Sequence, residues 1–300
     1  MIKELSFKST SDISDNICDF LLSIGSSGTV LDKDENDEVV SFNLTIKAYF
    51  DYDIDSNFIK NQIISYFNNL EKLGFNIISK EIIINDINNE GWENSYQEYF
   101  QPFEVGKNLV IKPIWHEYKN DNKVIIDFDP SSFFGVTPHP STRLCLEELE
   151  YLFYDYNKKG LDGKKNINFL DLGVGSGILS LVVHKFGVKN ITAIDIDEVA
   201  IRNATDNFLL NKIEAQLFLG EIDNCKEKYD FIAGNLLADT IIELSEKIKS
   251  KLNKNGYFIG AGITNLQEEK VITSLEKIGF LLENKRSYEN WTLLRFKNIN

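Results

Sequence analysis

The sequence predicts an α/β protein made of two parts. In the second part, residues 106–300, apolar strands alternate with amphipathic helices, which is the pattern of a mostly parallel sheet covered by helices on both faces. In the first part, residues 1–85, the order strand, helix, strand, strand, helix, strand is that of a ferredoxin-like α+β fold. A turn with three glycines, inside residues 167–177, marks the first strand-to-helix connection of the parallel sheet.

Hydrophobic periodicity defines the elements of the first part. Apolar residues that alternate with polar ones indicate half-buried strands, and apolar residues at helical spacing indicate amphipathic helices. We expect strands at 2–7, 28–31, 40–50 and 75–84 and helices at 13–24 and 59–70. Residues 86–105 are rich in Asn, Glu and aromatic residues, and we interpret them as a linker.

The second part opens with two further strands, at 109–114 and 124–128, a turn-rich loop and a helix that begins near Pro140. Strands and helices then alternate. We expect strands at 167–171, 190–195, 215–219, 229–233, 257–261, 281–288 and 292–296, with helices at 177–186, 198–210, 238–252 and 266–278. No helix separates the last two strands, so we expect them to form an antiparallel hairpin.

Composition and charge limit the classes of function. The chain is 43% hydrophobic and 26% charged, and it has no apolar run close to the roughly 20 residues that cross a bilayer. Its three cysteines form no C-x-x-C pair and its three histidines are scattered, so we expect no disulfide framework, no metal site and a reducing cytoplasmic location.

The net charge of −14 is concentrated in the first third of the chain. Residues 1–100 hold 7 Lys, no Arg and 18 Asp or Glu, a net charge of −11. Direct recognition of nucleic acid is not expected, because nucleic-acid binders carry the opposite charge. The acidic part could attract a basic protein, or it could serve only solubility; both interpretations stay open. We expect a monomer.

The glycine turn predicts a nucleoside pocket at the carboxyl edge of the sheet. Gly173, Gly175 and Gly177 give G-x-G-x-G, whereas the dinucleotide fingerprint needs glycine where Ile178 stands. Asp171, at the end of the strand before the turn, would repel a pyrophosphate but suits the zwitterionic amino-acid end of S-adenosylmethionine. Gly173 and Gly175 would let the backbone approach the ligand, since they carry no side chain.

Two carboxylates follow the next strand. Asp195 is predicted to accept both ribose hydroxyls of the cofactor in a bidentate hydrogen bond. Asp197 competes for this role, but its position favours capping of the following helix.

The end of the fourth strand and the loop before the parallel sheet complete the candidate site. Asn235, in Gly-Asn-Leu-Leu-Ala, could offer a carbonyl acceptor to an attacking amine, or could simply form a turn. Phe134, or its neighbour Phe133, could cover a sulfonium cation with an aromatic face. Thr142 could donate a hydroxyl hydrogen bond to the cofactor, and His139 could be a helix cap, a binding group or a base.

These pieces together resemble the ribosomal protein L-eleven methyltransferase family (PrmA) over nearly the whole chain. The segments that carry the resemblance are Gly91-Trp92-Glu93, Phe100-Gln101-Pro102, the Phe134-Gly135 to His139-Pro140-Ser141-Thr142 loop, Asp171 to Gly177, Ala193 to Asp197, and Asn235-Leu236-Leu237-Ala238. The family loop usually reads Phe-Gly-Thr-Gly-x-His, and this chain departs from it at Val136 and Thr137.

The resemblance implies a class I methyltransferase domain, Rossmann-like with a mostly parallel seven-stranded sheet, at 106–300. It also implies a substrate-recognition domain at 1–85 and transfer of methyl groups from S-adenosylmethionine to lysine ε-amines and the N-terminal α-amine of a large-subunit ribosomal protein. Cofactor-binding roles carry over to Thr142, Gly173, Asp195 and Asn235, the last also as catalytic residue. A paralogue that methylates another protein or a small-molecule amine, and a binding protein without catalysis, remain alternatives.

Overall fold

The computed structural model describes residues 2–10, 13–26, 28–33, 43–72, 75–87, 101–128, 139–158 and 167–299. The chain divides into two compact units, Met1–Phe100 and Gln101–Asn300. Each unit has a sheet and a hydrophobic core of its own.

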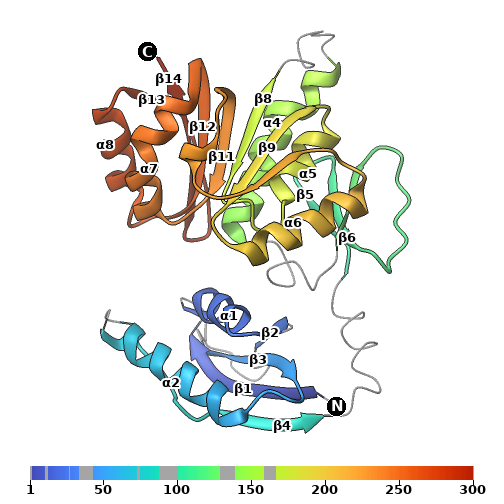
Figure 1. Ribbon diagram of the computed structural model, residues 1–300, viewed down its shortest axis with the longest axis vertical. Helices are drawn as coiled ribbons and strands as arrows, with labels where there is room; N and C mark the ends of the chain where they lie inside the picture. Colours follow the sequence, from blue (N-terminus) through green and yellow to red (C-terminus); the bar gives the residue numbers. More distant parts are fainter. Residues whose placement is uncertain are drawn as a thin grey trace. The chain divides into compact units, whose positions relative to one another are not determined.

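The first unit is built on a four-stranded antiparallel sheet with the strand order β2-β3-β1-β4 (Figure 1). Its elements are β1 (Ile2–Thr10), α1 (Ser14–Ser23), β2 (Gly28–Lys33), β3 (Asn43–Asp51), α2 (Ser56–Lys72) and β4 (Ile83–Ile87). Both helices pack on one face of the sheet: Phe7 of β1 contacts Phe67 of α2 edge-on at 5.2 Å, and Phe20 of α1 stacks on Tyr66 of α2 at 4.1 Å. This order and layering confirm the ferredoxin-like prediction.

The closing strand of this unit is shorter than its sequence pattern predicts. Residues 75–82 have no regular structure, and β4 begins only at Ile83, where pairing with Ser6 of β1 starts. Phe75 and Ile78 are exposed, so apolar residues alternate here without the neighbouring strand that would make the segment a strand. The prediction of a strand over 75–84 is therefore wrong except at its end.

The second unit contains a seven-stranded sheet with the order β10-β9-β8-β11-β12-β14-β13. Its strands are β8 (Asn168–Leu172), β9 (Asn190–Asp195), β10 (Gln216–Leu219), β11 (Tyr229–Asn235), β12 (Leu252–Thr264), β13 (Phe280–Tyr288) and β14 (Trp291–Asn298). The first five run parallel to one another, while β14 is antiparallel to both β12 and β13. The predicted mostly parallel seven-stranded sheet with a closing hairpin is confirmed.

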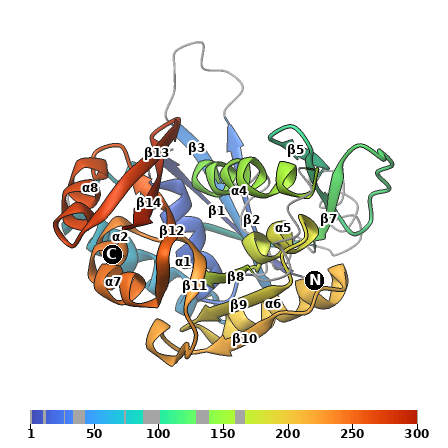
Figure 2. The same cartoon turned by 90° about the horizontal axis from the view of Figure 1, so that it is seen from above.

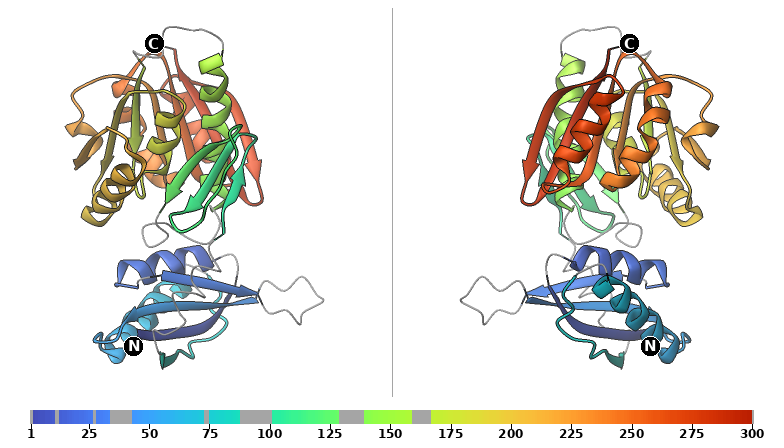
Figure 3. Two further views of the ribbon diagram at one scale, coloured as in Figure 1. Left: turned by 90° about the vertical axis from the view of Figure 1, so that its right-hand side faces the viewer. Right: turned by 90° about the vertical axis from the view of Figure 1, so that its left-hand side faces the viewer.

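Five helices within the described residues cover the two faces of this sheet. They are α4 (Pro140–Lys158), α5 (Ile178–Lys185), α6 (Glu198–Asn211), α7 (Ala238–Lys251) and α8 (Glu268–Lys277). Helices α4, α5 and α6 lie on one side of the sheet, and α7 and α8 lie together on the other (Figure 2). Figure 3 shows the two faces from opposite sides. Only the short 3-10 turn η3 (Ile222–Asn224) connects β10 to β11.

A small separate sheet precedes α4. It consists of β5 (Phe103–Val105), β6 (Leu109–Pro113) and β7 (Val124–Phe128), with β5–β6 antiparallel and β6–β7 parallel. Strand β5 falls within residues 86–105, which the sequence led us to interpret as a linker; residues 88–100 of that span lie outside the described part. The side chain of Asn211 on α6 anchors β7 by bonding the backbone N–H and C=O of Asp127, at 3.1 and 2.6 Å.

Helix α4 is fixed to the closing hairpin by a buried carboxylate. Glu148 is fully buried and accepts hydrogen bonds from Arg286 Nε and Arg295 Nη1, both at 2.5 Å, and from Asn284 Nδ2 at 3.0 and 3.2 Å. Two arginines and an amide therefore compensate the charge that burial would otherwise leave isolated. Because α4 begins at the predicted site, this network also sets the position of that end of the helix. No helix in the described part of the chain is long and apolar enough to span a membrane.

Candidate active site

The predicted site residues that the structure describes lie at the carboxyl edge of the parallel sheet. Strands β9, β8 and β11 are neighbours, and their ends carry Asp195, Asp171 and Asn235 respectively. Parallel strands bring their carboxyl ends to one edge, which is where open α/β sheets bind ligands. The start of α4 reaches the same edge, because Thr142 of that helix contacts Asn235.

The three glycines of the turn after β8 serve different purposes. All have positive φ angles, +76° at Gly173, +52° at Gly175 and +81° at Gly177, a region that glycine adopts without strain. A Cβ atom at Gly173 would lie 2.6 Å from the Leu236 side chain, and one at Gly177 would lie 2.5 Å from Phe208. A Cβ at Gly175 would meet no atom within 4 Å. Packing therefore explains Gly173 and Gly177, whereas Gly175 faces open space that a ligand can enter.

Asp171 is fully buried between the turn and helix α5. Its Oδ2 accepts the backbone N–H of Ser180 at 3.0 Å and the Ser180 hydroxyl at 2.7 Å, so the carboxylate satisfies a donor in the first turn of α5. Its Oδ1 is buried and has no hydrogen-bond partner in the described part of the chain. Burial raises the pKa of Asp171 to about 7, the two bonds from Ser180 oppose that rise, and the charge of Asp195 adds to it.

The two carboxylates after β9 have separate roles. Asp197 caps α6, because its side chain accepts the N–H of Val199 at 2.8 Å, as its position in the sequence predicts. Asp195 is half-buried beside the glycine turn: Oδ2 accepts the N–H of Gly175 at 3.1 Å and Oδ1 accepts the N–H of Asp197 at 3.1 Å. A carboxylate has about four acceptor positions, so each oxygen of Asp195 keeps one for a further donor.

Asn235 presents a carbonyl oxygen without a partner. Its Nδ2 donates to the Thr142 hydroxyl at 3.0 Å, whereas its Oδ1 is buried and receives no hydrogen bond from any described residue. The backbone around it is tightly held: the N–H of Leu236 donates to Ala261 O at 3.0 Å, and the close approach at Gly262 leaves no room for a Cβ atom. The arrangement fits an acceptor directed at a ligand N–H group better than a turn-forming asparagine.

His139, directly before α4, has the geometry of a helix cap. Its Nδ1 accepts the backbone N–H of Ser141 at 3.2 Å and lies 2.7 Å from the Ser141 hydroxyl. A backbone N–H can only donate, so Nδ1 is the acceptor in the contact with Ser141 N–H. The ring also packs edge-on against Trp291, with 4.4 Å between centroids. Of the three roles left open for His139, these contacts support the cap.

Some of these contacts escaped sequence reasoning, and one predicted residue cannot be placed. Ser180, Ser141 and Trp291 were not singled out from the sequence, although the Ser-Thr pair after a proline is a helix-start signal that indicates Ser141. Phe134, the predicted cover of the cofactor, lies outside the described residues together with the altered loop at Val136 and Thr137.

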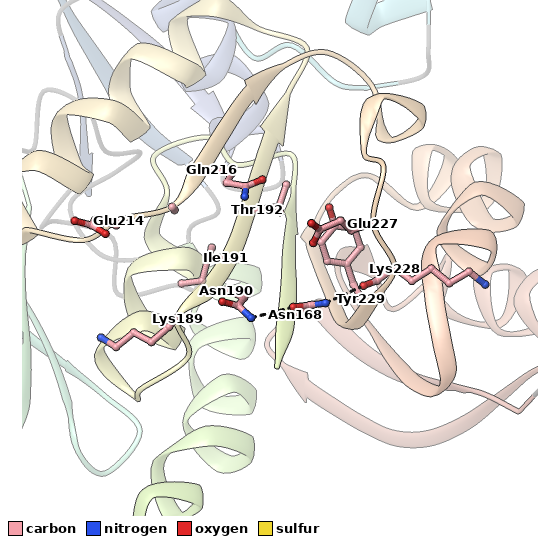
Figure 4. Close-up of a pocket in the computed structure, with 11 residues that line it drawn as sticks. Asn168, Lys189, Asn190, Ile191, Thr192, Glu214, Gln216, Glu227, Lys228 and Tyr229 are labelled. Carbon is pink, nitrogen blue, oxygen red and sulfur yellow. Dashed lines mark hydrogen bonds between the residues drawn. The ribbon is translucent and has the colours of Figure 1, made fainter. Parts of the chain in front are cut away.

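A separate hollow of about 760 Å³ lies at the opposite edge of the sheet, at the amino ends of β8, β9, β10 and β11 (Figure 4). It adjoins the connection between β10 and β11 that contains η3. Both signs of charge line it, from Lys189, Lys228, Glu214 and Glu227. None of the predicted site residues contributes to this hollow, so it is distinct from the candidate site.

Comparison with known proteins assigns the chain to a family. A model of the family described as ribosomal protein L11 methyltransferase (PrmA) matches residues 2–298. The ribosomal protein L11 methyltransferase of Geotalea uraniireducens is 31% identical over 297 residues, covering 94% of this chain and 93% of its own. That of Caldicellulosiruptor bescii is 32% identical over 312 residues, covering 97% of each chain.

A solved structure agrees with these relatives. The crystal structure of ribosomal protein L11 methylase from Lactobacillus delbrueckii subsp. bulgaricus superimposes with a TM-score of 0.58 and 28% sequence identity, covering 66% of this chain and 98% of that one. The family match over residues 2–298 takes in both units, and the two relatives cover 94% and 97% of the chain. The chain therefore belongs to the ribosomal protein L11 methyltransferase (PrmA) family and is a methyltransferase.

Proposed function

We propose that the protein transfers methyl groups from S-adenosylmethionine to amines of ribosomal protein L11, at lysine ε-amines and the N-terminal α-amine. The names of its relatives support this substrate. The observation that carries the proposal is the Oδ1 atom of Asn235, a buried acceptor without a partner at the edge where this fold binds ligands. Such an atom suits an incoming amine, which must lose water and find an acceptor for its N–H groups.

The residues at this edge fit S-adenosylmethionine. Gly175 leaves an open space beside the backbone, and the free acceptor positions of Asp195 next to it suit the two ribose hydroxyls. The partnerless Oδ1 of Asp171 suits the positively charged amino-acid end of the cofactor, since a buried carboxylate gains most from a cation. Together with Gly173, which shapes the turn, and Thr142, these residues form the proposed cofactor site.

The bound cofactor supplies a methyl group made electrophilic by its sulfonium sulfur. The protein then has to position the amine, which can supply several kcal/mol of the barrier reduction. Asn235 Oδ1 would accept one N–H of the amine and so direct its lone pair at the methyl carbon; after transfer, the extra proton leaves to water. Only the neutral amine can attack. A lysine amine has a reference pKa of about 10.4, so the rate should rise with pH above neutrality.

Substrate recognition is assigned to the first unit. Residues 1–100 carry a net charge of −11, which favours encounter with a basic protein, and ribosomal proteins of this kind are the expected partners. The interaction should weaken as salt is added, because charge steering is screened at ionic strengths above about 0.1 M.

Incubation with labelled cofactor and purified ribosomal protein L11 tests the proposal. Intact-mass spectrometry should show methyl additions on L11, and peptide mapping should place them on lysines and the N-terminus. The Asn235→Ala variant tests the positioning role: at a cofactor concentration that saturates the variant, checked by calorimetry, it should lose at least about tenfold in turnover. Label that enters another protein or a metabolite, with L11 unmodified, would refute the substrate. Unchanged turnover in Asn235→Ala would refute the role of this residue.

A further inference from the structure

The hydroxyl of Thr142, a residue of the proposed cofactor site, contacts the side-chain amide of Asn235. Thr142 lies in the first turn of α4 and is half-buried, 93 residues away in sequence from the asparagine that it contacts. A hydroxyl has a single proton but can also accept. Here the oxygen accepts from Asn235 Nδ2 at 3.0 Å, and no described residue accepts the proton of this hydroxyl.

The direction of that proton decides how the Asn235 amide is oriented. If the proton points away from Asn235, only oxygen lone pairs face the amide, so Nδ2 must turn toward Thr142 and Oδ1 toward the substrate. If the proton points at Asn235, the hydroxyl can equally bond Oδ1, and the flipped amide then presents N–H groups to the incoming amine. The flipped amide cannot accept an N–H from the amine, so only the first orientation is productive.

We propose that Thr142 is a positioning residue that couples cofactor binding to the orientation of Asn235. The proton of its hydroxyl is donated to an anionic oxygen of the bound cofactor, and the carboxylate at the amino-acid end is the group of suitable chemistry. Cofactor binding then leaves only lone pairs facing Asn235 and fixes Oδ1 toward the substrate amine. This inference rests on the proposed function, since it assigns the acceptor to S-adenosylmethionine.

Two matched variants separate this coupling from a structural role. Thr142→Val keeps the branched shape and removes the hydroxyl, whereas Thr142→Ser keeps the hydroxyl. We expect Thr142→Val to lower kcat at saturating cofactor by about tenfold or more, because misoriented catalytic groups lose effective concentration. Thr142→Ser should stay within about threefold of the parent, as expected when the hydrogen bonds are retained. KM for the protein substrate should change less than kcat in both variants.

A spectroscopic measurement tests the coupling without catalysis. The side-chain amide of Asn235, assigned by comparison with Asn235→Asp, should shift in a ¹H–¹⁵N spectrum when S-adenosylhomocysteine binds to the parent or to Thr142→Ser. In Thr142→Val it should not shift, while calorimetry confirms that the same ligand is bound and circular dichroism that the fold is kept. Thr142→Ala serves in the same way if the valine variant does not fold.

The results of these experiments show whether the coupling, the proposed function or both are wrong. Equal kcat in the parent and in Thr142→Val, or an Asn235 shift of the same size in both, overturns the coupling. If the parent binds S-adenosylhomocysteine but transfers no methyl group to L11, the proposed substrate fails, and the amide shift still decides the inference. If the parent does not bind the ligand at all, both fail.

Discussion

The raised pKa of Asp171 predicts a stability that depends on pH in an unusual direction. Burial raises its pKa from 3.8 to about 7. Between these values the folded protein keeps a proton that the unfolded chain has lost, so this group stabilises the fold at low pH. Its contribution is lost as pH rises from about 4 to about 7 and is constant above. At about 1.4 kcal/mol per pKa unit, the full change is at most about 4 kcal/mol.

Comparison with Asp171→Asn isolates this contribution from the other acidic groups. The asparagine does not titrate, and its carbonyl can still accept from Ser180. From pH 5 to pH 8, the free energy of unfolding of the variant should therefore rise relative to the parent by about 2–3 kcal/mol. Urea unfolding measures it, with Trp92→Phe in both proteins so that Trp115 and Trp291 report the second unit. A difference between the two proteins that does not change with pH would refute the raised pKa.

The same carboxylate predicts proton release when the cofactor site is filled. A positively charged group beside Asp171 favours the ionised form, so binding below pH 7 must displace its proton. We expect the affinity for S-adenosylhomocysteine to rise by up to about tenfold per pH unit below pH 7 and to level off above it. Calorimetry in buffers of different ionisation enthalpy measures the released proton directly. A parent that shows the same pH profile as Asp171→Asn would contradict this linkage.

Substitutions of four other residues separate effects on stability from effects on cofactor binding. Glu148→Ala should lower the free energy of unfolding by about 3–5 kcal/mol in urea, since it leaves two arginine charges without their buried partner. Gly175→Ala should cost only about 1 kcal/mol of stability, from the positive φ angle, but should weaken cofactor binding by tenfold or more in calorimetry, roughly the effect of one lost close contact. Asp197→Ala should lose about 1 kcal/mol of cap stability and keep binding, whereas Asp195→Ala should lose binding; the reverse result would exchange their roles.

Most of the fold follows from local sequence patterns. Alternation and helical spacing locate the strands and helices of the second unit because each element buries one face. Where apolar and polar residues do not alternate, the sequence does not predict a strand. The sequence predicts a helix to residue 252 and a strand only from 257, yet β12 begins at Leu252, which pairs with Tyr229 before a register shift, and Asn255 has a φ of +63°. The three residues of β5 are too few to show a period at all.

The sequence indicates single residues of the candidate site but not the contacts between them, and this difference has a physical reason. Asp195 and Asp171 follow directly from their positions at strand ends, because chain order fixes those positions. The bond between Thr142 and Asn235 and the packing of His139 on Trp291 join residues far apart in sequence, and no local pattern reports them. The three glycines of the turn look alike in the sequence. In the structure, a Cβ atom at Gly173 or Gly177 would clash with a neighbouring side chain, whereas one at Gly175 would not.

Asp171 and Asn235 together indicate what the site was built to hold. Each has a buried oxygen without a hydrogen-bond partner, and each such group costs about 1–3 kcal/mol in the free protein. When Asp171 is ionised both oxygens are acceptors, and both lie at one sheet edge, so a ligand that relieves this cost must donate hydrogen bonds there. A cofactor with an ammonium group and a substrate with an amine meet that requirement. Phosphate groups in the same place could donate to neither oxygen and would be repelled by the charge of Asp171.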